Sequence, residues 1–198
     1  ALLHTLDNPN AYGTSADDYF GSAVAISDNY AIVSTTNEDD AGGFDSGKAY
    51  IFNNSTGALV HTLNNPNAYG TRESDEFGAR VAITDTYAIV GAGAEDDASG
   101  DASGKAYIFN VSTGALVHTL NNPNASFADN FGREVAISGN YAIVSSQSYA
   151  NGASGIRYSG KAFIFNVTTG ALVHTLDNPN PYGTSADDYF GYSVAISG

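Results

Sequence analysis

Apolar residues occur in short runs along the whole chain, and turn-forming residues separate these runs. Runs rich in β-branched and aromatic residues, bounded by Gly, Asn and Asp, predict strands. Four kinds of run recur in a fixed order, first seen complete as SAVAIS (22–27), YAIVS (30–34), KAYIFN (48–53) and ALVHTL (58–63). No segment has helical periodicity, so the pattern predicts an all-β protein.

The four runs form a unit that repeats about every 57 residues, over 1–57, 58–114, 115–170 and a partial copy at 171–198. Four antiparallel strands repeated at this period are typical of β-propeller blades. The second and third runs are apolar on both faces, as Ile32 and Val33 illustrate, which is expected for a sheet packed between two others. A β-sandwich and a β-solenoid remain the alternatives.

The order of the runs predicts three full blades plus split terminal strands, at residues 1–6 and 192–197. Because a closed propeller has about four to eight blades, we do not expect this segment to close alone. The chain has no Met, and Ala1 begins in mid-pattern. We therefore expect either part of a longer array or a module that borrows strands from other copies.

Charge and composition narrow the classes of function. Seven Lys and Arg against 21 Asp and Glu give a net charge of −14, which argues against binding to nucleic acids or anionic membranes. The chain has no Cys, and no apolar run is long enough to cross a membrane as a helix. No G-x-S-x-G or H-E-x-x-H motif is present, and we predict that the chain is not an enzyme.

A Phe-Gly pair stands just before each run of the first kind, at Phe20-Gly21, Phe77-Gly78, Phe131-Gly132 and Phe190-Gly191. Followed by a YAIV strand, an acidic Gly-rich loop and GKAYIF, this arrangement resembles the FG-GAP repeat. That repeat builds the propeller of integrin α chains and of many secreted bacterial proteins, and this chain looks most like the divergent bacterial or phage type. The segment GKAYIFNVSTGALVHTL is also similar to the blade of quinone-type propellers, without their terminal tryptophan.

The resemblance implies an extracellular binding or structural module, often one used in adhesion. Integrin-type repeats hold calcium in a D-x-D-x-D-G-like loop between the first two strands of a blade. Here that position reads only SDNY, TDTY or SGNY. The family's calcium site is therefore not carried over to any residue of this chain.

Carboxylates concentrate in the two long connections of each unit, which leave an up-and-down blade on the same side. Calcium takes six to eight oxygen ligands, so these loops are a candidate calcium site. The alternative, which we favour, is a solvated acidic rim that prevents aggregation of near-identical β units. The candidate ligands are Asp17, Asp18, Glu38, Asp39, Asp40, Asp45, Glu95, Asp96, Asp97 and Asp101.

Tyrosines beside Asn-Pro-Asn turns form a second candidate surface, because aromatic faces pack on sugars while amides bind hydroxyls. The alternative is that each ring packs under its own loop. The loop around 149–158 of the third unit departs from the repeat and is a candidate for an individual contact. The candidate ligand-binding residues are Tyr12, Tyr69, Tyr182, Tyr149, Arg157 and Tyr158.

Identical placement in every unit favours structural roles for the histidines (His4, His61, His118, His174) and for the lysines of the SGKA segments. The sequence therefore predicts a non-enzymatic structural or adhesive module, extracellular or on a cell or virion surface. Its expected partners are further blades of the same chain, other copies, or a protein or glycan ligand. A calcium-dependent adhesin is the alternative.

Overall fold

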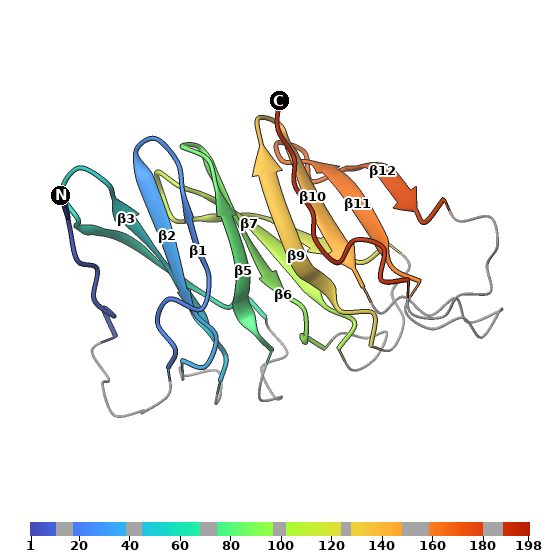
Figure 1. Ribbon diagram of the computed structural model, residues 1–198, viewed down its shortest axis with the longest axis horizontal. Coiled ribbons are helices and arrows are strands. Elements are labelled where there is room, and N and C mark those ends of the chain that lie inside the picture. Colours follow the sequence, from blue (N-terminus) through green and yellow to red (C-terminus); the bar gives the residue numbers. More distant parts are fainter. Residues whose placement is uncertain are drawn as a thin grey trace.

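The computed structural model describes residues 1–10, 18–38, 45–67, 75–96, 102–123, 128–147, 159–179 and 188–198. These residues form twelve strands, arranged in three antiparallel sheets of four. Figure 1 shows the sheets side by side along the molecule, each made of strands consecutive in the chain. Within this described part, no helix has the length and hydropathy needed to cross a membrane.

Each sheet corresponds to one repeat unit and keeps its strands in sequence order. The first sheet contains β1 (Val24–Ile26), β2 (Tyr30–Thr35), β3 (Lys48–Asn53) and β4 (Leu59–Asn64). The second contains β5 (Phe77–Ile83), β6 (Tyr87–Ala92), β7 (Lys105–Asn110) and β8 (Leu116–Asn121). The third contains β9 (Phe131–Ser138), β10 (Tyr141–Ser146), β11 (Lys161–Asn166) and β12 (Leu172–Asp177). The three predicted blades are thus confirmed.

The two middle strands of each sheet supply the core, as their apolar pattern predicts. In the first sheet Ile32 and Ile51 are fully buried against the second sheet, while Val33 and Tyr50 are 6% and 2% exposed on the opposite face. In the second sheet, Ile89 and Ile108 likewise point to one face and belong to the hydrophobic cluster shared with the third sheet. A strand apolar on both faces is stable only between two layers, and the stacking of blades provides these layers.

The Phe-Gly pairs anchor each first strand to its own blade. The Phe77 ring lies 5.8 Å from Tyr107 and 6.2 Å from Phe109, centroid to centroid, and Phe131 meets Phe163 and Phe165 in the same way. Both phenylalanines are fully buried. The residue before each Phe adopts a left-handed backbone conformation, at Tyr19, Glu76, Asn130 and Tyr189.

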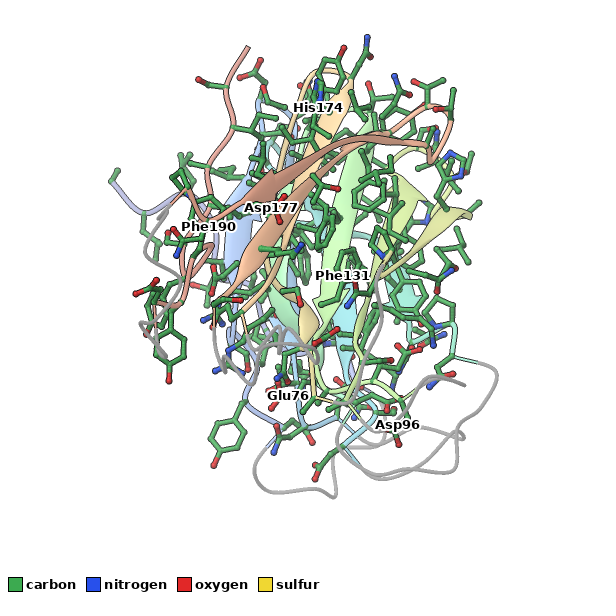
Figure 2. All side chains as sticks on the ribbon, turned by 90° about the vertical axis from the view of Figure 1, so that its right-hand side faces the viewer. Glu76, Asp96, Phe131, His174, Asp177 and Phe190 are labelled. Atoms are coloured by element: carbon green, nitrogen blue, oxygen red, sulfur yellow. The ribbon has the colours of Figure 1, made fainter. Side chains whose placement is uncertain are left out.

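The terminal segments differ from the prediction, because residues 1–6 and 192–197 are not paired as strands. A strand is held by a hydrogen-bonded neighbour, and no described segment pairs with either one. Packing near both ends nevertheless follows that of the corresponding residues in other units. His4 lies against Gly57 as His61 lies against Gly114, and the carbonyl oxygen of Phe190, just before the final run, lies against Gly160 as that of Phe131 lies against Gly104. Figure 2 looks onto the third sheet, with His174 and Asp177 on β12 and Phe190 in the final segment.

Candidate functional site

Two of the candidate calcium ligands, Glu38 and Glu95, are fully buried at the ends of the sheets. Glu95 Oε1 lies 2.6 Å from Lys105 Nζ, and the Tyr107 hydroxyl donates to the same carboxylate at 2.6 Å. Glu38 repeats this arrangement with Lys48, at 2.7 Å, and Tyr50. Burial is the main cause that raises the pKa of both tyrosines, with the glutamates adding to it. We call each set, Glu38–Lys48–Tyr50 and Glu95–Lys105–Tyr107, a Glu-Lys-Tyr triad.

In the third blade the glutamate and the tyrosine of the triad are replaced together, while the lysine is kept. Its counterparts of Glu95 and Tyr107 are Tyr149 and Phe163, so the buried acid and the hydroxyl that binds it are both missing. Lys161 instead pairs with Asp177 at 2.6 Å, where the other blades have Asn64 and Asn121. The equal spacing of Glu, Lys and Tyr in two units, and the joint loss of Glu and Tyr in the third, is the sequence signal that identifies the triad.

The aspartate two residues before each Phe-Gly pair is held by an asparagine of the preceding Asn-Pro turn. Asn65 Nδ2 donates to Asp75 at 2.9 Å, and Asn67 Nδ2 donates to the same carboxylate at 3.1 Å. The first of these bonds recurs in every unit, as Asn8 to Asp18, Asn122 to Asp129 and Asn178 to Asp188. The candidate ligand Asp18 therefore closes its own connecting loop.

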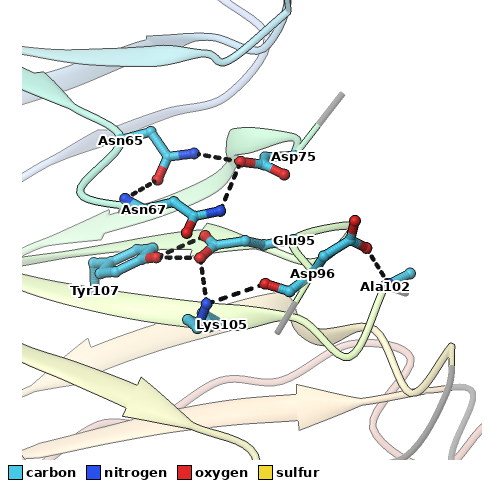
Figure 3. A network of polar contacts seen from close by, with 8 residues as sticks. All are labelled: Asn65, Asn67, Asp75, Glu95, Asp96, Ala102, Lys105 and Tyr107. Atoms are coloured by element: carbon cyan, nitrogen blue, oxygen red, sulfur yellow. Dashed lines mark hydrogen bonds and ion pairs between the residues drawn. The ribbon is translucent and has the colours of Figure 1, made fainter. Parts of the chain in front are cut away.

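Asp75, Glu95 and Asp96 lie around Lys105 at one end of the second blade (Figure 3). Asp96 Oδ1 accepts the backbone N–H of Ala102 at 2.7 Å, and the Asp96 carbonyl oxygen accepts Lys105 Nζ at 3.3 Å. Burial raises the pKa of Asp75 and of Glu95 above their ordinary values, and the neighbouring carboxylates add to both shifts.

Of the remaining candidate residues, only Asp45 lies among the described residues. Asp45 has a left-handed backbone, with φ of 52°. Among described residues, no three Asp, Glu or His side chains are arranged to hold a metal ion. The other candidates lie outside the described residues, and their roles stay predictions: Asp17, Asp39, Asp40, Asp97, Asp101, Tyr12, Tyr69, Tyr149, Arg157, Tyr158 and Tyr182.

The histidines and the first hairpin turns join neighbouring blades. His118 Nε2 lies 3.0 Å from the Thr168 carbonyl oxygen, and its ring covers Gly170 in the next blade. Asp85 accepts the Ser27 hydroxyl at 2.6 Å and the Asn29 amide at 2.7 Å from the preceding blade. Through these contacts the histidines hold neighbouring blades together, in keeping with the structural role predicted for them.

The comparisons with known proteins agree with this arrangement of blades. The model of the FG-GAP repeat matches residues 10–52, 67–109 and 117–165, which is most of the chain. The chain belongs to the FG-GAP repeat family. No curated protein matches this FG-GAP chain.

Solved structures show a similar fold. The computationally designed Ika4 protein superposes with a TM-score of 0.53 at 15% identity, over 90% of this chain and 79% of Ika4. The designed Ika8 protein gives a TM-score of 0.49 at 16% identity, over 79% of this chain and 36% of Ika8. The likeness to Ika4 concerns the fold alone.

The buried acids predict how stability of this FG-GAP chain depends on pH. Because the folded-state pKa of Asp75 lies above its unfolded value, the folded state holds the proton more tightly, and the contribution to stability is lost as pH rises through the folded pKa. We expect the Asp75→Asn variant to lose less stability than the wild type as pH rises from the ordinary aspartate value of about 4 towards neutral pH. Urea unfolding at a series of pH values measures this.

Asp85 serves as a control, because its pKa is shifted in the opposite direction to that of Asp75. The Ser27 hydroxyl and the Asn29 backbone N–H lower the pKa of Asp85, so its contribution is present above the unfolded pKa and is lost as pH falls through the folded one. In the Asp85→Asn variant the change in unfolding free energy between pH about 5 and pH about 7 should equal that of the wild type. Only the loss of stability at lower pH should become smaller. Equal pH profiles for wild type and Asp75→Asn would contradict the assignment.

Proposed function

We propose that this chain is a non-enzymatic structural or adhesive module, exposed outside the cell or on a virion. The observation that carries the proposal is that each blade uses its reactive side chains to hold itself together. Lysines and glutamates pair inside the triads, aspartates bind asparagines, and histidines pack on the next blade. An array built in this way offers many equivalent surfaces on a rigid frame.

The face of the first blade supports a role within an array. Val24 and Ile26 are 67% and 72% exposed, whereas their counterparts Val81 and Ile83 are each 8% exposed beneath the preceding blade. We propose that a further blade, from the same chain or from another copy, covers this face in the working assembly. Burial of such apolar area stabilises association by about 25 cal/mol per Å².

Location is the direct test of this proposal. An antibody raised against the chain should label intact cells or virions of the source organism, and externally added protease should remove the label. Protection from the protease until the cells are lysed would contradict the proposal.

A calcium-dependent adhesin for a protein or glycan ligand is the second candidate. The cluster of Asp75, Glu95 and Asp96 favours it, because the three acids lie around one lysine, and the pKa values of Asp75 and Glu95 are raised, chiefly by burial. Melting in calcium and in a chelator separates the two proposals. A calcium-dependent rise in Tm that Asp96→Asn abolishes supports the adhesin, and equal Tm values support the structural module.

A further inference from the structure

A polar pocket of about 300 Å³ is lined by residues of all three blades, none of which belongs to the triads or to the acid cluster. It lies where the first strands of the second and third blades begin, beside the end of β2. Its lining comes from Ser22, Thr36, Asn37, Glu76, Ala79, Arg80 and Arg133. Pockets that bind small molecules have volumes of roughly 300 to 1,000 Å³, so this one can hold about one sugar residue.

The repeat is broken at this pocket. All four first-strand runs share the core Val-Ala-Ile, but the two residues after Phe-Gly differ in each: Ser22-Ala23, Ala79-Arg80, Arg133-Glu134 and Tyr192-Ser193. Packing of the blades does not explain these differences, because the Val and Ile positions that follow are the same in all four runs. Unlike side chains on a repeated frame are what a single binding site requires.

The two arginines of the pocket differ in their hydrogen-bond and ion-pair partners. Arg80 Nε binds Glu134 Oε1 at 2.7 Å, and Arg80 Nη1 donates to the Ala79 carbonyl oxygen at 2.7 Å. The exposed Arg133 side chain makes no hydrogen bond or ion pair with any described residue. Every other lysine and arginine in the described part of the chain has an acidic partner. An arginine without a partner in a protein of net charge −14 is an available anion site.

The polar groups that line the pocket together with Arg133 suit hydroxyls. Ser22 Oγ donates to the Tyr19 carbonyl oxygen at 2.7 Å and lies 3.2 Å from Thr36 Oγ1. Thr36 Oγ1 donates to Asn37 Oδ1 at 2.9 Å, which leaves the Asn37 amide nitrogen to donate into the pocket. Glu76 adds an acceptor for ligand hydroxyls and disfavours a ligand that carries only negative charge.

From these groups we infer that the pocket binds a carboxylate-bearing sugar residue of the uronic acid class. The planar Arg133 guanidinium receives the carboxylate through two parallel hydrogen bonds, which suits a carboxylate better than a point charge does. Asn37 and Glu76 receive the ring hydroxyls. This binding activity goes beyond the structural role proposed above and does not depend on it.

Isothermal titration of the full chain at physiological salt tests the inference, with a trimer of galacturonic acid as the probe and the galactose trimer as the neutral match. The acidic trimer should bind at least about tenfold more tightly than the neutral one, since loss of a charge-assisted bidentate contact costs about 1.5 to 3 kcal/mol. Arg133→Gln should lose this difference, and Arg133→Lys should recover only part of it.

Lys161→Gln is the matched control, because it removes one positive charge from the same blade without touching the pocket lining. It should leave binding unchanged, and circular dichroism should show that both variants are folded. The inference is overturned if the acidic trimer does not bind, if it binds Arg133→Gln equally well, or if sulfated galactose binds in place of the carboxylate. None of these outcomes would affect the surface-location test of the proposed structural role.

Discussion

Replacement of Gly104 by alanine should destabilise the fold by about 3 kcal/mol. The residue has φ of 78°, and an added Cβ would lie 2.1 Å from the Phe131 carbonyl oxygen of the next blade. A left-handed backbone costs a non-glycine residue about 1 to 2 kcal/mol, and overpacking costs about 1 to 3 kcal/mol more. In a chain of this length the loss corresponds to a fall in Tm of roughly 10 °C, measurable by calorimetry.

Gly139 separates the two contributions. It also has a positive φ, of 52°, but an added Cβ would meet no atom within 4 Å. Gly139→Ala should therefore cost only the backbone contribution, about 1 kcal/mol. Equal losses for the two variants would show that the approach of the second and third blades is not what makes glycine necessary at Gly104.

Replacement of Lys105 by methionine should cost about 3 to 5 kcal/mol. It leaves the fully buried Glu95 without its cation, and breaking a buried ion pair from one side leaves an uncompensated charge. Asp75 nearby deepens the loss, because it already raises the pKa of Glu95. Denaturant unfolding measures the change in free energy.

The double variant Glu95→Gln with Lys105→Met should recover more than half of this loss. The glutamine side chain carries no charge and still accepts the hydrogen bond from Tyr107. The third blade supports this expectation, because it has neither the glutamate nor the tyrosine at the corresponding positions. A loss below about 1 kcal/mol for Lys105→Met would contradict the structural importance of the triad.

The blades could be predicted from the sequence because their signals are local. The YAIV and KAYIF runs carry the pattern of buried strands, and turn residues lie at the hairpins. The structure confirms these strands in all three sheets. The terminal runs carry the same pattern but form no strand, because strand pairing depends on a neighbour that the pattern itself does not supply.

The acidic residues could not be assigned in the same way. Glu38 and Asp18 stand in similar acidic loops, yet Glu38 lies fully buried beside Lys48, and Asp18 closes a loop by binding Asn8. A charge run in a sequence is normally read as a solvated surface. The distinction needs the positions of residues about ten apart in the chain, which hairpin geometry brings together.

The sequence by itself determined the repeat, the strand order and the family, because hydrophobic alternation and turn chemistry act within a few residues. Only the tertiary structure decided which charges are neutralised and which remain available. Arg80 and Arg133 look alike in the sequence, but one is paired with Glu134 and the other opens into a pocket built from three blades. That difference arises from contacts between residues more than fifty positions apart, which only the stacking of the blades creates.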